Sequence, residues 1–378
     1  MGSALTDTQW LIDPGVAYLN HGGFGALPVP VADAADTLRR EIEANPSDVF
    51  MRRWADLVDE VRRTAAELLG ADAADLVFVP NATAGTATVL ASLQLDAGDE
   101  IVITDHRYPA VASQAGLLQE RGIRLVEAQV PLDVATAADV VDAVTANVTS
   151  RTKLVVIDQI ASPTGFVFPV AEIVAAVHAM DVPILVDAAH APGQVPVDLR
   201  SIDADFWVGN LHKWVCSPRA CAALRVAPAW QDRIRPLVPS HDYFDGFQRA
   251  FDWTGTADPI PLLAIPAAID FWTQLGWDDA RNYGHGLVTD GAHLVADRLG
   301  TRVPIADEFT AAMRLIELPR PMTAPDGVAL NERILAEHKV MAHVTHLQGR
   351  SFVRVCGQLY NVPEHYERLA TALDAVLS

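Results

Sequence analysis

Short apolar segments alternate with amphipathic stretches over the first two thirds of the chain. Seven of these segments have the length and composition of buried strands: LVFV (76–79), EIVIT (100–104), RLVEAQV (124–130), KLVVID (153–158), PILVD (183–187), DFWVG (205–209) and CAALRV (221–226). Stretches between them, such as VAEIVAAVHAM, carry apolar residues at steps of three and four, which predicts helices. Strands and helices in strict alternation predict an α/β fold with a doubly wound, mostly parallel seven-stranded sheet.

The last quarter of the chain, from about residue 285, has a different rhythm. Its segments read in turn as helix, strand, helix, strand and helix: GLVTDGAHLVADRL, AMRLIELP, NERILAEH, FVRVCG and EHYERLATALDAVL. This order predicts a smaller α+β C-terminal domain over residues 285–378, beside a large domain over 16–256. The stretch 257–284 begins with a Pro-containing segment and predicts a connecting helix, and residues 1–15 are expected to pack near the small domain.

Composition and charge limit the possible partners. With 378 residues, half of them apolar, the chain is long enough for one large core and a second domain. A formal net charge of -20 argues against a nucleic acid or an anionic membrane as partner. No apolar run approaches the length of a membrane span, and the N-terminus, MGSALTDTQW, lacks a basic region followed by an apolar one. These features predict a cytoplasmic protein that binds small molecules.

Lysine is rare in this chain, which draws attention to Lys213. Only Lys153, Lys213 and Lys339 occur among 28 basic residues, so arginine is used almost wherever a positive charge suffices. Lys213 lies in an apolar stretch, DADFWVGNLHKWVCSP, where a cation is hard to house. A desolvated lysine has a lowered pKa and can form a Schiff base, which arginine cannot do. The alternative is a lysine whose amine extends from a strand end to solvent.

A carboxylate ends the predicted strand that precedes this lysine. PILVD is an unbroken apolar run up to Asp187 and is followed by small residues, as in a fully buried parallel strand. Open α/β sheets bind ligands at the carboxyl ends of their strands. A buried Asp187 needs a cationic partner, and the pyridinium nitrogen of a cofactor is one. The 26 residues from Asp187 to Lys213 leave room for a crossover that returns to the same edge of the sheet.

The segment NATAGTATVLASL predicts a helix whose N-terminus can accept a phosphate. Asn81 is a capping-type residue, so backbone N–H groups at Ala82 and Thr83 and the positive end of the helix dipole face outward. A dianionic phosphate fits such a helix terminus. The alternative is an ordinary N-cap, which would be the preferred interpretation for an isolated NAT.

Eight short motifs follow one another along nearly the whole chain. They are YLNHGGFG (18–25), NATAG (81–85), TDHRY (104–108), SPTG (162–165), VDAAH (186–190), NLHKW (210–214), WTGT (253–256) and VRVCGQLYN (353–361). Together they resemble the class V aminotransferase group of fold-type I pyridoxal-phosphate (PLP) enzymes, most closely its isopenicillin N epimerase-like branch. The resemblance implies a PLP cofactor on Lys213, an amino-acid-like substrate and a homodimer with a shared active site.

The resemblance also implies which residues hold the cofactor's phosphate. Those in the same subunit lie at the predicted helix start and beside the lysine: Asn81, Ala82, Thr83, Asn210 and His212. Gly255 and Thr256 are implied to reach the phosphate from the other subunit.

A second group of matching residues is implied to contact the cofactor ring. His106 or Tyr108, after a strand end, stacks on the ring, and Asp187 pairs with its nitrogen. His190 lies near the phenolic oxygen. Ser162 occupies a position where related enzymes often carry an Asn that approaches the ring.

Arg354 lies inside a predicted strand, between Val353 and Val355. An arginine that points off a strand can bind a carboxylate through two parallel hydrogen bonds. The resemblance implies that Arg354 anchors the α-carboxylate of the substrate, whereas the pattern alone also allows an exposed strand arginine. Asn20 and His21, in YLNHGG, are expected to line the substrate mouth, where the glycines permit close backbone approach.

The cysteines argue against one branch of this superfamily. Cysteine desulfurases carry a nucleophilic Cys on a loop before the arginine that corresponds to Arg354, and EHKVMAHVTHLQGRSF contains none. Cys216, Cys221 and Cys356 are odd in number and lack metal-type spacing. We expect three buried core residues, with no disulfide and no metal site.

These expectations converge on chemistry at the Cα of an amino acid. Asp187 would keep the ring nitrogen protonated while the freed Lys213 amine removes the Cα proton as general base. Proton return from the opposite face by His106, Tyr108 or water gives epimerisation, loss of a β-substituent gives a lyase of the C–S type, and protonation at the cofactor gives an aminotransferase. We predict an epimerase, with the lyase as the main alternative.

Two other classes of protein are disfavoured by the sequence. A nucleotide-binding α/β enzyme would carry a GxGxxG or a P-loop at a strand-to-helix turn, and this chain has neither. A PLP fold that has lost catalysis and serves as a binding partner would not need to retain both Lys213 and Asp187.

Overall fold

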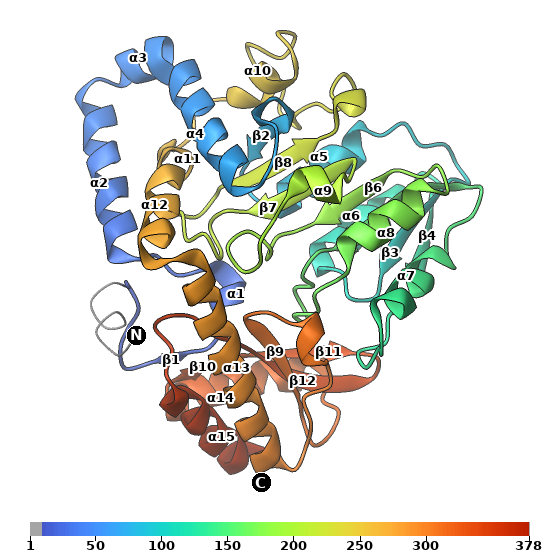
Figure 1. Cartoon of the computed structure of the whole chain (residues 1–378), viewed down its shortest axis with the longest axis vertical. Helices are drawn as coiled ribbons and strands as arrows, with labels where there is room; N and C mark the ends of the chain where they lie inside the picture. Colours follow the sequence, from blue (N-terminus) through green and yellow to red (C-terminus); the bar gives the residue numbers. More distant parts are fainter. Residues whose placement is uncertain (1–9, 378) are drawn as a thin grey trace.

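The computed structural model describes residues 10–377 and has a large and a small unit joined by a long helix (Figure 1). The large unit contains a seven-stranded sheet in the order β2-β8-β7-β6-β5-β3-β4. Its strands are β2 (Leu76–Val79), β3 (Glu100–Thr104), β4 (Arg124–Ala128), β5 (Thr152–Asp158), β6 (Ile184–Asp187), β7 (Phe206–Asn210) and β8 (Ala222–Val226). Strand β8 is antiparallel to both neighbours and the other pairs are parallel. The predicted mostly parallel sheet is confirmed.

Helices cover both faces of this sheet. One core includes side chains of α5 (Ala82–Ser92), α6 (Pro109–Gln119) and α10 (Phe247–Asp252). The other includes side chains of α2 (Val29–Ala44), α4 (Trp54–Leu68), α7 (Ala137–Thr145), α8 (Val170–His178), α9 (Leu199–Ile202), α11 (Ile260–Leu263) and α12 (Ile265–Leu275). Within β5, Leu154 and Val156 belong to the first core and Val155 and Ile157 to the second. Alternate residues of this strand therefore face opposite sides, and both sides are buried.

The small unit is an antiparallel sheet in the order β11-β12-β9, from β11 (His343–Leu347), β12 (Arg350–Cys356) and β9 (Met313–Glu317). It packs with α13 (Trp277–Leu299), α14 (Ala324–His338) and α15 (Pro363–Leu377). A further two-stranded parallel ladder joins β1 (Ala17–Tyr18) to β10 (Val340–Met341). Residues at the start of the range expected for the large domain therefore pair with the C-terminal unit. Of residues 1–15, expected near the small domain, 1–9 lie outside the described residues.

The connecting stretch 257–284 consists of several helices. It holds α11, α12 and the first part of α13. Gly276 lies between α12 and α13 and has a φ of 85°. A positive φ of this kind is readily adopted only by glycine, so a helix end is built in at this position. The short α3 (Pro46–Asp48) lies between α2 and α4 at the far end of the large unit (Figure 1).

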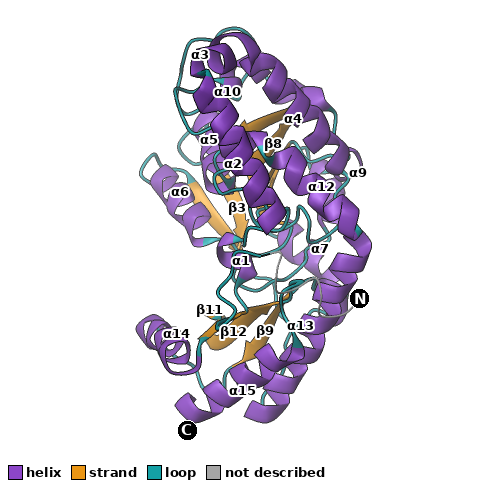
Figure 2. Ribbon diagram, turned by 90° about the vertical axis from the view of Figure 1, so that its left-hand side faces the viewer, coloured by secondary structure: helices purple, strands orange, loops and turns teal. Residues whose placement is uncertain are grey.

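The carboxyl ends of the parallel strands define the place of a site. Thr104, Asp158, Asp187 and Asn210 are the last residues of β3, β5, β6 and β7 and lie at one edge of the sheet. This edge faces the small unit, and both views place α1 (His21–Phe24) between the two units (Figure 2). No helix among residues 10–377 is long and apolar enough to cross a membrane.

Candidate functional site

Lys213 lies in the loop between β7 and β8, held between two glycines from other segments. A Cβ on Gly25 would lie 2.3 Å from the His212 carbonyl oxygen, and one on Gly193 would lie 2.5 Å from that of Trp214. Both glycines have a positive φ, of 70° and 87°. Only glycine allows this backbone-to-backbone contact, which fixes the loop on both sides of the lysine.

The amine of Lys213 is surrounded by ionisable groups. Its Nζ lies 3.1 Å from Nε2 of His190. Burial, and then the positive charge of Arg354, lower the pKa of Lys213 to about 8, although Asp187 and Cys356 oppose the shift. An amine with this pKa has a sizeable neutral fraction near pH 8, as a nucleophile or a general base requires.

Asp187 ends β6 as predicted and is only 4% exposed. Its carboxylate accepts a 3.0 Å hydrogen bond from the backbone N–H of Ala189. Burial raises the pKa of Asp187, and the Ala189 N–H and the charge of Lys213 oppose that shift. A cation placed against this carboxylate would favour its ionised form.

A second buried carboxyl group, Asp158, lies beside Asp187 and was not predicted. The two are paired in register at the ends of β5 and β6. Burial and the neighbouring Asp187 raise the pKa of Asp158 well above its usual range. The sequence carried a signal, because KLVVID ends in Asp just as PILVD does.

Arg354, on β12, reaches the same site from the small unit and is 4% exposed. Its Nη2 donates a 2.8 Å hydrogen bond to Oδ1 of Asn20, and its Nη1 donates to the carbonyl oxygen of Ser162. Its Nε is buried and has no hydrogen-bond partner in the described part of the chain. A buried cation with a free donor is suited to an anionic ligand. Ser162 contributes a backbone oxygen here.

His21 was expected to line the substrate mouth, and its side chain is fully buried in the structure. Its Nε2 donates a 3.0 Å hydrogen bond to the carbonyl oxygen of Lys213, and its Nδ1 lies 3.0 Å from the hydroxyl of Tyr360. Burial lowers the pKa of His21 to about 3, so the ring is neutral. It holds the backbone of the lysine through this hydrogen bond.

The structure also separates the two candidates for ring stacking. His106 is 0% exposed, bonded through Nδ1 to Thr164 at 3.0 Å and through Nε2 to the Val130 carbonyl at 2.8 Å. Phe166 packs edge-on against its ring. Because the side chain is fully buried, His106 has no open face for a cofactor. Tyr108 is 41% exposed and near enough to Arg354 to affect its pKa. The stacking role stays a prediction, and the exposed ring of Tyr108 fits it better than the buried ring of His106.

The start of α5 differs in detail from the expected phosphate site. Asn81 caps the helix by accepting a 2.9 Å hydrogen bond from the N–H of Ala84. We expected the N–H of Ala82 to bind a phosphate. Instead it donates a 2.8 Å hydrogen bond to the side chain of Asn210 and is not free to do so. Thr83 is exposed at the helix start. The positive end of the helix dipole, with Thr83, is what remains for an anion.

His212 adjoins Lys213 in the same loop. Its Nδ1 donates a 2.9 Å hydrogen bond to the Cys221 carbonyl, and burial lowers its pKa to about 4. Gly255 and Thr256 are exposed, and Gly255 lines a different cavity of about 130 Å³ with aromatic residues that include Trp54 and Trp253. Their contact with a phosphate across a dimer stays a prediction.

The three cysteines are buried and are not paired with one another. Cys356 Sγ accepts a 3.3 Å hydrogen bond from the N–H of Gly22, and burial raises its pKa. Burial also raises the pKa of Cys216 and Cys221. Protonated, enclosed thiols are poor nucleophiles. Within residues 10–377 no group of three or more His, Cys, Asp or Glu side chains could hold a metal ion.

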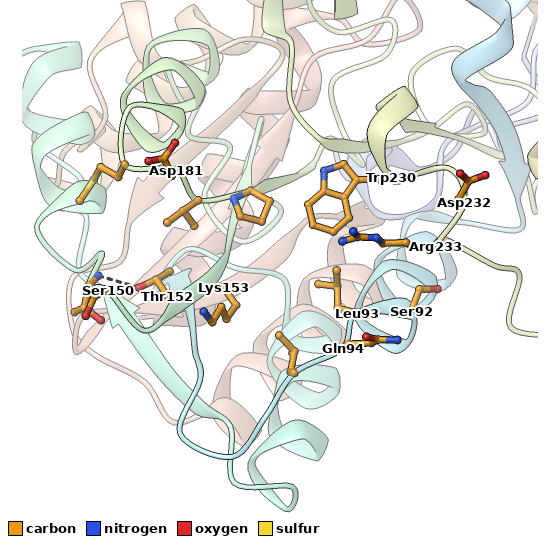
Figure 3. Close-up of a pocket in the computed structure, with 15 residues that line it drawn as sticks. Ser92, Leu93, Gln94, Ser150, Thr152, Lys153, Asp181, Trp230, Asp232 and Arg233 are labelled. Atoms are coloured by element: carbon orange, nitrogen blue, oxygen red, sulfur yellow. Dashed lines mark hydrogen bonds between the residues drawn. The ribbon is translucent and has the colours of Figure 1, made fainter.

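A larger cavity, of about 810 Å³, lies at the opposite ends of the strands (Figure 3). Lys153, near the start of β5, and Arg233 lie in its lining together with Asp181 and Asp232. The two cations are thus balanced by two carboxylates. Because parallel sheets bind ligands at the carboxyl ends of their strands, the edge with Lys213 and Asp187 is the candidate active site.

Comparisons with known proteins identify the family of the chain. Residues 17–355 match the family described as Aminotransferase class-V. The isopenicillin N epimerase of Streptomyces clavuligerus is 30% identical, over 97% of this chain and 96% of its own length. A putative L-cysteine desulfhydrase of Oryza sativa subsp. japonica is also 30% identical, over 97% of this chain and 84% of its own. The solved structure of the cystine C-S lyase C-DES superposes with a TM-score of 0.81 at 21% identity, covering 95% of this chain and 97% of that chain.

Proposed function

The chain belongs to the class V aminotransferase family, whose enzymes depend on PLP, and we propose that it epimerises an amino acid or an amino-acid-derived substrate at Cα. The main support is the cluster of Lys213, Asp187 and Arg354 at one edge of the sheet. The pKa of the lysine amine there is lowered in part by the charge of a buried arginine that has a free donor.

The residues present fit PLP. Lys213 would hold the cofactor through its amine, and Asp187 offers a buried carboxylate for a cationic ring nitrogen. The N-terminus of α5, with Thr83, would accept the phosphate, and Tyr108 would lie against the ring. When bound, PLP supplies an electron sink that acidifies the Cα proton of the substrate.

Each remaining step is assigned to a side chain of this protein. Arg354 orients the substrate carboxylate with its free Nε–H and a second donor. The neutral amine of Lys213 removes the Cα proton on one face. Epimerisation also needs a proton donor on the other face, and we assign this to Tyr108 because His106 is enclosed by other side chains.

Incubation in deuterated water tests the reaction type. A panel of amino acids is incubated with the PLP-loaded protein, followed by chiral chromatography and mass spectrometry. We expect solvent deuterium at Cα, interconversion of the two stereoisomers and no release of a keto acid. Pyruvate formed in step with substrate loss, without interconversion, would overturn the epimerase proposal.

A β-eliminating lyase of the C–S type is the second candidate. It is favoured by the 30% identity to a protein named as a putative L-cysteine desulfhydrase. Elimination needs proton removal on one face only, so Lys213 alone would suffice. Pyruvate, ammonia and a sulfur-containing fragment from a thioether or sulfoxide amino acid would identify it. An aminotransferase is less well supported, and a persulfide mechanism lacks an accessible cysteine among the described residues.

We also propose that the enzyme is a homodimer in the cytoplasm. Gly255 and Thr256 are exposed and lie near a cavity lined by aromatic side chains, which suits burial against a second copy. The net charge of -20 gives no basis for binding nucleic acid or anionic membranes.

A further inference from the structure

Trp214 directly follows the lysine and contacts it through a histidine. The indole of Trp214 is 3% exposed, and its Nε1–H donates a long, 3.4 Å hydrogen bond to Nδ1 of His190. The other ring nitrogen of His190, Nε2, lies 3.1 Å from Nζ of Lys213. Three side chains therefore form a line that runs from the indole to the amine.

His190 in the middle of this line is neutral. Its side chain is 0% exposed, and its pKa lies well below the usual range. Burial is the main cause, and the charges of Lys213, Arg354, His21 and His212 act in the same direction. A neutral imidazole carries one N–H, on either Nδ1 or Nε2.

The tautomer of His190 follows from its partners. An indole N–H can only donate, so Nδ1 of His190 must be the acceptor and the proton must be on Nε2. An Nε2–H group then points at Nζ of Lys213. A neutral amine can accept this bond through its lone pair, whereas an ammonium group has no lone pair.

We infer that Trp214 is a positioning residue that fixes the Nε2–H tautomer of His190 and thereby favours the neutral amine of Lys213. With a protonated amine, His190 would have to accept at Nε2 and carry its proton on Nδ1, where it would face the indole N–H. The indole thus disfavours protonation of Lys213 without touching it. The inference rests on the proposed function in one respect only, which is that Lys213 is the amine that removes the Cα proton in the proposed reaction.

The other groups that act on Lys213 are distinct from this line. Arg354 lowers the pKa of Lys213, whereas Asp187 and Cys356 raise it. Trp214→Phe leaves all three of these side chains in the protein. Replacement of Trp214 by Phe removes the donor and keeps an aromatic ring in the packed cluster with Ala312, Met313 and Cys356.

The test measures the pKa of Lys213 by NMR in the full-length, PLP-free protein with ¹³Cε-labelled lysine. Only three lysines occur, so Lys213 is assigned by its loss in Lys213→Ala. We expect Trp214→Phe to raise the pKa by about 0.4–1 unit, roughly a 2–10-fold change in the protonation constant, because one hydrogen bond is lost. An unchanged or lowered pKa would overturn the inference.

Trp272→Phe is the matched control. Trp272 is also 3% exposed, and its Nε1–H donates to the Val215 carbonyl at 2.9 Å, away from His190. This variant should leave the pKa of Lys213 unchanged, and an equal rise in both variants would refute a specific role for Trp214. Should Trp214→Phe not fold, ¹⁵N-histidine NMR of the PLP-loaded wild type decides, since an Nδ1–H tautomer of His190 contradicts the inference. Neither measurement depends on which reaction the enzyme performs.

Discussion

Replacement of Arg354 separates the geometry of this side chain from its charge. In Arg354→Lys the positive charge stays, but a lysine lacks the planar fork that binds a carboxylate with two hydrogen bonds. It also leaves the Ser162 carbonyl or Oδ1 of Asn20 without its present donor. In Arg354→Gln both the charge and the fork are lost.

The number of hydrogen bonds lost in each variant sets the size of the expected loss in kcat/KM. A hydrogen bond to a charged group contributes about 1.5–3 kcal/mol, so losing one of two in Arg354→Lys should lower kcat/KM by about 10–100-fold. Losing both in Arg354→Gln should lower it by roughly 10²–10⁴-fold. Because Arg354 lowers the pKa of Lys213, which is about 8, Arg354→Gln should also raise that pKa, and Arg354→Lys should change it little.

The assay combines steady-state kinetics with the lysine titration by NMR. Arg314→Lys is the control, since Arg314 is 0% exposed and binds Asp307 and Thr289 at 2.7 Å each. Its buried Nε also has no hydrogen-bond partner among residues 10–377. Arg314→Lys should lower the free energy of unfolding by about 1–3 kcal/mol and leave kcat/KM nearly unchanged. Wild-type kcat/KM in Arg354→Lys, or an equal loss in Arg314→Lys, would refute the reasoning.

Four further substitutions test other parts of the site. Asp187→Asn should keep the cofactor, seen by its absorbance, but lower turnover by about 10²-fold or more, because an amide cannot balance a charged ring nitrogen; wild-type turnover would remove Asp187 from the site. Tyr108→Phe should slow interconversion of stereoisomers by about 10²-fold, measured by chiral chromatography, whereas His106→Gln should mainly lower thermal stability; the reverse pattern would restore His106 to the site. Thr256→Ala should speed loss of PLP on dialysis, and unchanged retention would contradict a shared site.

The sequence predicted the large sheet because most of its strands are buried on both faces, although the edge strand β4 is partly exposed. Such strands are short, continuous apolar runs, and all seven were found at their observed places. Strand β11 was missed because HVTHL is polar and rich in histidine. A signal did exist in Gly349, since glycine favours the positive φ of a tight hairpin turn. In the structure Gln348 and Gly349 have φ values of 50° and 73°.

The site was predictable where it depends on strand ends and not where it depends on packing between distant segments. Asp187 could be placed because a parallel strand delivers its last residue to a known edge. The burial of His106 could not be predicted, since it depends on Thr164 and Phe166 from another loop. The contact of His21 with Lys213 likewise joins residues 192 positions apart in sequence.

The central claim is that Lys213 holds PLP at the carboxyl edge of the sheet. Reduction of the PLP-loaded protein with borohydride, followed by proteolysis and mass spectrometry, tests it directly, because the chain has only three lysines to distinguish, Lys153, Lys213 and Lys339. We predict a pyridoxyl group on the peptide that contains Lys213, and no reducible adduct in Lys213→Ala. An adduct on Lys153 or Lys339, or one that persists in Lys213→Ala, would contradict the account.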